Sequence, residues 1–345
     1  MPAPRRVLAA LLAAVAALVG LVGAAAPAAA DPRPTAVVAL GDSAAAGDGA
    51  GDYVAGTRGE GGNWCHRSPH AYVHASGLAA ESVNLACSGA EAADVAFGST
   101  THYTEGSQAE RLVEVATRYR VTVVTLQVGA NDDPELIATL IACIRTFVNP
   151  AEPPCRETIG PSWSARVAAM APKVEAAVRD VRAAMRRAGY SDSEYAFVLA
   201  SYASPVTEHM VAGVARGCPY SRADAAWGRT VALPQLSAAL RGVAEPTGVR
   251  FLDLSRASEG YEACARVTAS QEWQRRLTVD PEPLVRGGLD ALGWHLAQES
   301  FHPTARGHAE MGRCLGEFVR SAADSAACLA GRDGRLHADV RVTAA

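Results

Sequence analysis

The chain has 345 residues, of which 49% are hydrophobic and 20% are charged, and its formal net charge is −4. This length allows one large domain or two ordinary ones, and the composition excludes collagen-like, low-complexity and wholly disordered proteins. Charged residues are spread along the chain without a basic run, which argues against a nucleic-acid surface built on phosphate contacts. After these exclusions, the composition is that of a globular protein.

The first thirty residues predict a secretory signal peptide. Arg5 and Arg6 precede an apolar run over residues 7–26, and three alanines at 28–30 supply a small-residue cleavage pattern. The run is nearly long enough to span a bilayer, so an uncleaved anchor is the alternative. Its alanine and glycine content makes it weakly hydrophobic, however. We therefore expect a secreted, extracellular protein without a stable membrane anchor after cleavage.

Eight cysteines lie beyond the predicted signal peptide. An even number of cysteines in an oxidising compartment is typical of disulfides, and the lack of a C-x-x-C motif argues against a zinc ribbon or a thioredoxin-like site. Pairing neighbours along the chain is the simplest of the possible connectivities. That pairing would close four local loops, between Cys65 and Cys87, Cys143 and Cys155, Cys218 and Cys264, and Cys314 and Cys328.

Strand and helix patterns alternate along the chain. A β-branched run over residues 35–41 ends in glycine and predicts a buried strand, whereas residues 164–188 carry apolar side chains at helical spacing. Weaker helical patterns cover 108–119 and 305–323. Such alternation predicts an α/β domain with a parallel sheet and helices on both faces. Four further strands are expected at 82–86, 121–129, 195–202 and 249–254.

We therefore expect one domain over residues 31–328 with a sheet of about five strands. Residues 329–345 show no core pattern and are expected to form a surface tail.

Polar residues and glycines follow the first three predicted strands, at the rim where ligands bind in parallel sheets. Ser43 follows the first strand in Gly41-Asp42-Ser43, Gly89 follows the second, and Asn131 follows the third. Glycine lets a backbone N–H approach a ligand closely, and an asparagine amide can donate to an oxyanion. Taken alone, Ser43 is also typical of a turn or helix cap, Gly89 of an ordinary strand-to-loop glycine, and Asn131 of a helix N-cap.

A histidine near the C-terminus could complete this chemistry. His302 lies in Glu299-Ser300-Phe301-His302-Pro303, and an imidazole can take the proton from a serine hydroxyl. Glu299, three residues earlier, could accept a hydrogen bond from the other ring nitrogen. Taken alone, a histidine before proline is more often a turn residue.

The order Ser43, Gly89, Asn131, His302 resembles the four sequence blocks of the SGNH (GDSL) hydrolase family over residues 35–316, roughly. The chain is similar in particular to secreted lipases and esterases of Streptomyces and related actinobacteria, through Cys65-His66-Arg67-Ser68 with Ala71-Tyr72, and through residues 86–90. The resemblance implies a single flavodoxin-like, three-layer domain, with Ser43 as nucleophile and His302 as general base. The N–H groups of Ser43 and Gly89 and the Asn131 side chain would form the oxyanion hole.

Two positions depart from the family pattern. Ala44 stands where the GDSL motif has leucine, and Glu299 stands where the family usually has aspartate. Some actinobacterial relatives orient the histidine with a backbone carbonyl instead of a carboxylate. A triad with Glu299 and a dyad with a carbonyl of Glu299 or a neighbour therefore both stay open.

The resemblance implies a secreted, monomeric ester hydrolase that acts on carboxylic or lipid esters and needs no cofactor. Alternatives within the family are a phospholipase or a carbohydrate O-deacetylase. A catalytically inactive secreted binding protein is the alternative from another class.

Two sets of side chains in the sequence could suggest a metal site. His66, His70 and His74 are spaced four apart, and a second set comprises His295, Glu299, His302 and His308, but prolines or glycines interrupt both spacings. A calcium loop beginning at Asp48 fails at its third position, and Asp48 is expected to be a solvated loop residue. We expect no metal.

Overall fold

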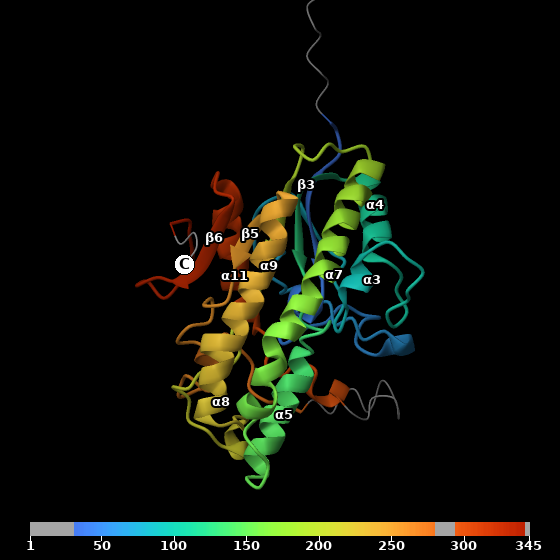
Figure 1. Cartoon of the computed structure of the whole chain (residues 1–345). Coiled ribbons are helices and arrows are strands. Elements are labelled where there is room, and N and C mark those ends of the chain that lie inside the picture. Colours follow the sequence, from blue (N-terminus) through green and yellow to red (C-terminus); the bar gives the residue numbers. More distant parts are fainter. Residues whose placement is uncertain (1–30, 280–293, 342–345) are drawn as a thin grey trace, which may run out of the picture. The chain divides into compact units, whose positions relative to one another are not determined.

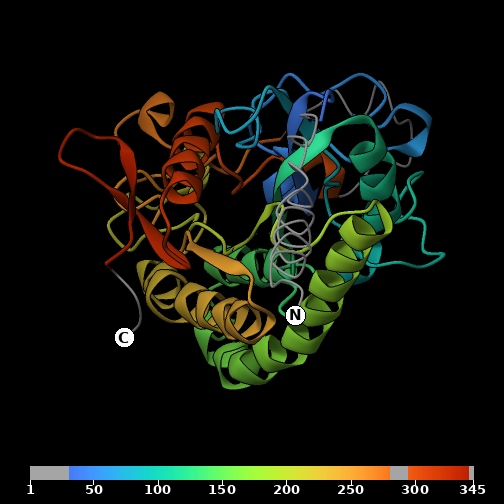
Figure 2. The same ribbon diagram turned by 90° about the horizontal axis from the view of Figure 1, so that it is seen from above.

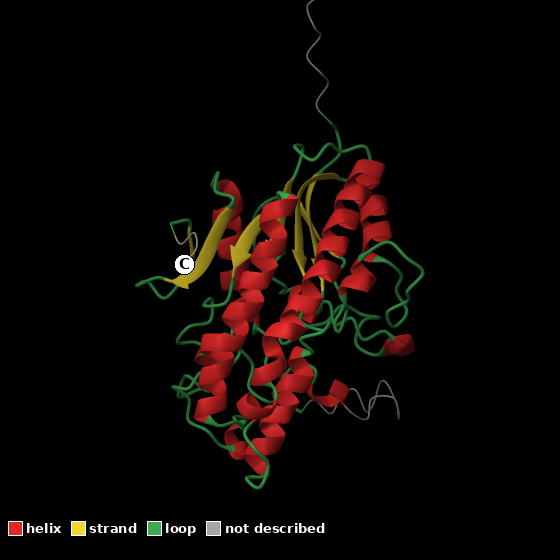
Figure 3. Ribbon diagram, in the orientation of Figure 1, coloured by secondary structure: helices red, strands yellow, loops and turns green. Residues whose placement is uncertain are grey.

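A seven-stranded sheet runs through the part of the chain that this computed structural model describes, residues 31–279 and 294–341 (Figures 1 and 3). The predicted signal peptide lies outside these residues. The strand order is β2-β1-β3-β4-β5-β6-β7; the first six strands are parallel, and β7 pairs with β6 in antiparallel fashion. The strands are β1 (Thr35–Gly41), β2 (Glu81–Asn84), β3 (Arg120–Gln127), β4 (Ala196–Ala200), β5 (Arg250–Asp253), β6 (Ser325–Ala330) and β7 (Leu336–Asp339).

The α/β fold and the first five strands agree with the sequence prediction, but the expected number of strands was too low. β6 reads SAACLA, and its alanines give it little of the β-branched character that marks the other strands. The expectation of a surface tail from residue 329 onward was also wrong in part, because β7 lies in this segment and its Leu336 is fully buried. An edge strand of four residues is too short to show a periodic pattern.

Alternate side chains of β1 point to opposite faces of the sheet, as strand geometry requires. Val38 and Leu40 pack with α4 (Gln108–Arg118), α7 (Gly160–Arg187) and α9 (Leu233–Thr247). Val37 and Ala39 pack on the other face against α11 (Ala305–Arg320). Figure 2 shows α7 and α9 together on one side of the sheet and α11 on the other. The result is the expected three-layer arrangement.

The three predicted helices correspond to α4, α7 and α11. No helix in the described ranges has the length and apolar character that crossing a membrane requires. Among the residues that the structure describes, the remaining α-helices are α2 (Ser43–Ala46), α3 (Ala92–Val95), α5 (Leu136–Val148), α6 (Cys155–Thr158) and α8 (Arg222–Trp227). A π-helical turn, η3 (Gly228–Ala232), joins α8 to α9, and 3-10 turns cover Glu60–Gly62, Val214–Arg216, Ala269–Gln271 and Trp294–Ala297.

Four disulfides pair the cysteines with their neighbours along the chain, as the simplest connectivity predicts. They are Cys65–Cys87, Cys143–Cys155, Cys218–Cys264 and Cys314–Cys328, with Cα–Cα distances from 4.1 to 6.2 Å. By closing loops in the unfolded chain, each is expected to stabilise the fold by about 2–4 kcal/mol. Cys65–Cys87 and Cys218–Cys264 join segments outside the helices and strands, whereas Cys143–Cys155 links α5 to α6 and Cys314–Cys328 links α11 to β6.

Candidate active site

Close packing at the end of β1 fixes the position of Ser43. Gly41 has a φ of +134°, and a Cβ atom there would lie 1.9 Å from the carbonyl oxygen of Gln127 on β3, so only glycine fits. The side-chain amide of Gln108 accepts from the N–H of Gly41 and donates to its C=O, both at 2.8 Å. Asp42 then caps α2 by accepting from Ala44 N at 3.0 Å. Ser43 is consequently held as the first residue of α2.

The structure brings Ser43 and His302 together across 259 residues of sequence: Ser43 Oγ lies 2.7 Å from His302 Nε2. The other ring nitrogen, Nδ1, lies 3.1 Å from the carbonyl oxygen of Ser300. Because a carbonyl can only accept, Nδ1 carries the proton and Nε2 is free to accept from the serine hydroxyl. This is the tautomer that a general base requires.

The Glu299 carboxylate faces a different partner. Its Oε2 lies 3.0 Å from Arg275 Nη1, and the Tyr53 hydroxyl also hydrogen-bonds to it. Arg275 in turn donates through Nε to the carbonyl oxygen of Gly49 at 2.9 Å. Glu299 therefore takes part in a clamp between the loop that carries His302 and the loop after α2. Of the two arrangements left open by the sequence, the geometry favours the one with a backbone carbonyl, that of Ser300.

Asn131 lines the same cavity as Ser43 and His302. Its Nδ2 donates to the carbonyl oxygen of Ala90 at 3.0 Å, which uses one of the two amide hydrogens and leaves the second for a ligand. The neighbouring Asp132 accepts from Ala92 N at 3.1 Å. The loop after β3 thus holds the loop after β2 in place.

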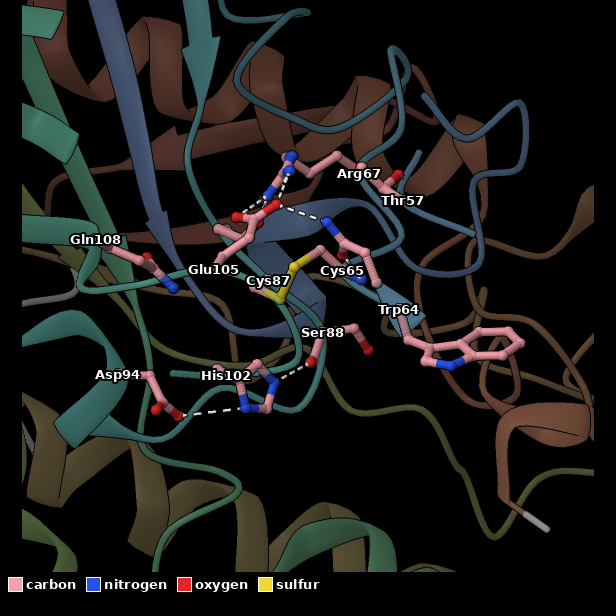
Figure 4. The surroundings of a disulfide bond; sticks show 12 residues. Thr57, Trp64, Cys65, Arg67, Cys87, Ser88, Asp94, His102, Glu105 and Gln108 are labelled. Atoms are coloured by element: carbon pink, nitrogen blue, oxygen red, sulfur yellow. Dashed lines mark hydrogen bonds and ion pairs between the residues drawn. A yellow bond between two sulfur atoms is a disulfide. The ribbon is translucent and has the colours of Figure 1, made fainter. Parts of the chain in front are cut away.

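The peptide unit between Ser88 and Gly89 is held through the carbonyl oxygen of Ser88, which His102 contacts (Figure 4). His102 Nε2 donates to the carbonyl oxygen of Ser88 at 2.7 Å, and Asp94 Oδ2 lies 3.6 Å from His102 Nδ1. In a trans peptide the C=O and N–H point in opposite directions, so anchoring Ser88 O also sets the direction of Gly89 N–H. Gly89 itself has a φ of +78°, in the left-handed region that glycine tolerates.

A buried polar network behind Ser88 was not predicted from the sequence. Asp48 is fully buried, contrary to the expected solvated loop residue, and its Oδ1 lies 2.7 Å from His66 Nδ1. Its Oδ2 accepts a hydrogen bond from Ser88 Oγ. Gln298 Nε2, four residues before His302, donates to the same hydroxyl at 2.7 Å. Asp48, Ser88 and Gln298 therefore join the three loops that carry Ser43, Gly89 and His302.

The three histidines spaced four apart have separate hydrogen-bond partners. His66 pairs with Asp48, while His70 lies 2.8 Å from Asp52 and His74 lies 2.6 Å from Ser82 Oγ. Within residues 31–279 and 294–341, no group of three or more His, Cys, Asp or Glu side chains is placed to hold a metal ion.

Burial shifts the pKa of two groups close to Ser43. Desolvation raises the pKa of Asp42 to about 7, although the hydrogen bond from Tyr202 Oη at 2.5 Å works against this rise. Desolvation lowers the pKa of His308 to about 4, and its Nε2 lies 3.4 Å from the carbonyl oxygen of Asp48. Burial therefore shifts both groups toward their neutral forms relative to the same groups in water.

The cavity at Ser43 encloses about 530 Å³ of space, part of it open to solvent. Apart from the polar groups already described, its walls are mainly apolar and include Ile137, Leu140 and Phe301. A serine–histidine pair with amide donors beside an apolar cavity is the arrangement of an acyl-transfer site.

Comparison with known proteins agrees with this geometry. Residues 39–310 match the GDSL-like Lipase/Acylhydrolase family. The chain belongs to this family. It is 32% identical over 271 residues to "Lipase 2" of Streptomyces coelicolor, a match that covers 76% of this chain and 85% of that protein. The resemblance noted from the four sequence blocks is thereby confirmed, and the chain is a carboxylic ester hydrolase of the GDSL-like family.

Solved structures support the fold assignment. Phospholipase A1 from Streptomyces albidoflavus NA297 matches with a TM-score of 0.51 at 21% identity, covering 80% of this chain and 95% of that one. The extracellular lipase of Streptomyces rimosus matches with a TM-score of 0.51 at 22% identity, covering 79% and 94%. At these identities the likeness concerns the fold, which is the SGNH hydrolase fold expected from the sequence.

Proposed function

We propose that this GDSL-family hydrolase is a secreted enzyme that cleaves carboxylic or lipid esters through an acyl-enzyme on Ser43. The observation that carries the proposal is the 2.7 Å contact between Ser43 Oγ and His302 Nε2, in the tautomer set by the Ser300 carbonyl. A serine activated by an adjacent base is the general device for acyl transfer.

The reaction proceeds in two halves. Ser43 Oγ attacks the ester carbonyl carbon while His302 Nε2 takes the hydroxyl proton. The carbonyl oxygen becomes an oxyanion, which faces the N–H groups of Ser43 and Gly89 and the Nδ2 of Asn131. The C–O bond to the alcohol then breaks, and His302 returns the proton to the leaving oxygen. A water molecule activated by the same imidazole attacks the acyl-enzyme, which releases the acid and restores Ser43.

The nature of the pocket and the relatives favour ester substrates with an apolar acyl group. Apolar side chains such as Ile137, Leu140 and Phe301 line the cavity beside Ser43. The related Streptomyces coelicolor protein is named a lipase. These two points support esters with apolar acyl groups over acetylated carbohydrates as the proposed substrates.

Secretion rests on the N-terminal pattern of residues 1–30 and on four disulfides, which persist in oxidising compartments. Sequencing the N-terminus of protein recovered from the medium of an expressing actinobacterium tests this directly. We expect a mature chain that begins at or within a few residues of Asp31. Retention of the full-length chain in the membrane fraction would contradict it.

Labelling with a fluorophosphonate tests the nucleophile. The purified protein is expected to form a stoichiometric adduct that peptide mapping places on Ser43, and the variants Ser43→Ala and His302→Ala are expected to remain unlabelled. Ester hydrolysis should disappear in parallel. An unlabelled wild-type protein, or an adduct on another serine, would overturn the proposal.

A further inference from the structure

Ser88, which precedes the glycine proposed as an oxyanion donor, is fully buried, and each of its polar groups has a partner. Its N–H donates to the carbonyl oxygen of Cys65 at 3.1 Å, and its own carbonyl oxygen accepts from His102 Nε2 at 2.7 Å (Figure 4). Its hydroxyl contacts Asp48 and Gln298. The backbone contacts fix the peptide plane of Ser88, whereas the hydroxyl contacts link this residue to two other segments of the chain.

The direction of the hydrogen bonds at the Ser88 hydroxyl follows from its neighbours. An ionised carboxylate can only accept, so the hydroxyl donates its hydrogen to Asp48 Oδ2. Its oxygen is then left to accept, and Gln298 Nε2 donates to it at 2.7 Å. The same Nε2 donates its other hydrogen to the carbonyl oxygen of Trp64 at 3.0 Å. Because that carbonyl can only accept, it also fixes which end of the amide carries the nitrogen.

Gln298 belongs to the segment that carries the proposed general base. It is buried and lies four residues before His302, in residues 298–302, which we term the base loop. Its partner Ser88 lies 210 residues earlier, in residues 87–90, which we term the oxyanion loop. The side-chain amide of Gln298 therefore joins the two loops directly. Moving one loop against the other would leave buried polar groups unpaired, which is unfavourable.

The mechanism proposed above requires the two loops to be correctly placed at the same time. The base takes the proton from Ser43 while the Gly89 N–H meets the oxyanion that forms on the attacked carbonyl. A misplacement of about 1 Å in such a site can lower the rate by roughly a hundredfold. The contact between Gln298 and Ser88 holds the two loops in place before any charge develops.

We propose that Gln298 and Ser88 are positioning residues, which lock the base loop to the oxyanion loop through the bond from Gln298 Nε2 to Ser88 Oγ. The proposal rests on the acyl-enzyme mechanism proposed above. Neither side chain lines the cavity at Ser43, so both act through their neighbours rather than on the ester. Both halves of the reaction pass through an oxyanion, so loosening the loops lowers kcat whichever half is slower.

Two substitutions remove the contact from opposite sides. Ser88→Ala deletes the hydroxyl, and Gln298→Met replaces the amide by an apolar side chain of similar length. Ser237→Ala is the matched control for Ser88→Ala, because Ser237 is also buried and its hydroxyl donates to a carboxylate, that of Asp253, at 2.8 Å. Ser237 lies on α9 and does not line the cavity at Ser43.

The experiment measures kcat, KM and Tm with one p-nitrophenyl ester in wild type, both single variants, the Ser88→Ala/Gln298→Met double variant and Ser237→Ala. Each single variant is expected to lower kcat about tenfold while KM stays within about twofold of wild type. Because both substitutions remove the same bond, the double variant should also lose about tenfold, whereas independent effects would multiply to about a hundredfold. Ser237→Ala should lower Tm without lowering kcat.

Two outcomes overturn the proposal: wild-type kcat in either single variant, or a loss of about a hundredfold in the double variant. Should Ser88→Ala fail to fold, Gln298→Met alone decides, because it leaves the bond from Ser88 to Asp48 in place. Fluorophosphonate labelling of the wild type separates these failures from failure of the proposed function. If Ser43 is labelled and kcat does not respond, only the positioning role is wrong. If Ser43 is not labelled, the acyl-enzyme mechanism itself is wrong.

Discussion

His102 Nε2 donates a 2.7 Å hydrogen bond to the carbonyl oxygen of Ser88, the residue that precedes Gly89. The imidazole thereby acts on the far side of the peptide plane that contains the Gly89 N–H. Asp94, 3.6 Å from Nδ1, holds the ring from behind (Figure 4). His102 is therefore placed to orient the Gly89 N–H, which we propose as one oxyanion donor.

Replacing His102 should impair the chemical step more than substrate binding. His102→Ala is expected to lower kcat by roughly tenfold to a hundredfold with little change in KM, because the oxyanion forms only as the reaction proceeds. His102→Gln, which can still donate to Ser88 O, should recover part of the loss. Steady-state kinetics with one p-nitrophenyl ester measures both values. The control is His337→Ala, which changes a half-exposed histidine on β7. A rise in KM with unchanged kcat in His102→Ala would refute the positioning role.

Asn131→Ala should be more severe. Loss of one oxyanion donor costs on the order of 3 kcal/mol, or a hundredfold or more in kcat. The variant also loses the bond from Nδ2 to Ala90 O, worth about 1 kcal/mol, so Tm should fall by only a few degrees. Kinetics and thermal unfolding on the same preparation separate the two effects. Nearly full activity would show that the asparagine does not contact the oxyanion.

Glu299→Gln distinguishes the dyad from a triad. Because Ser300 O orients His302 and the Glu299 carboxylate faces Arg275, activity should stay within a few-fold of wild type. Removing the orienting carboxylate of a true triad lowers kcat by about 10⁴. A loss of that size in a folded Glu299→Gln protein would show that the Glu299 carboxylate orients His302 as the third member of a triad. His302→Ala provides the inactive reference.

His308 should make stability fall on mild acidification. Its pKa is lowered from 6.5 to about 4 by burial, so the folded state binds fewer protons than the unfolded state between these values. The contribution of His308 is complete above pH 6.5 and is lost as the pH falls to about 4, by at most about 3 kcal/mol. Urea unfolding of wild type and His308→Gln at pH 7.5 and 4.5 measures it. The variant should lose less stability between the two pH values; equal losses would contradict the assignment.

The sequence predicted what local patterns encode. β-branched runs mark β1 and β3, and glycine or asparagine after a strand marks the rim, so Ser43, Gly89 and Asn131 could be found before the fold was known. β6 could not, because a run dominated by alanine lacks strand character. Contacts between distant segments, such as Asp48 with His66 and Ser88, leave no trace in local spacing. The choice between Glu299 and the Ser300 carbonyl likewise depends on the path of the chain around His302.

The 259-residue separation between Ser43 and His302 has a consequence for synthesis. The proposed nucleophile emerges early, whereas its proposed base emerges late, as does Arg275, which links the two loops. A partly synthesised or C-terminally truncated chain carries the serine without an acceptor for its proton. In the mechanism proposed above, hydrolysis requires both side chains, so a nascent chain that ends before His302 is expected to be inactive.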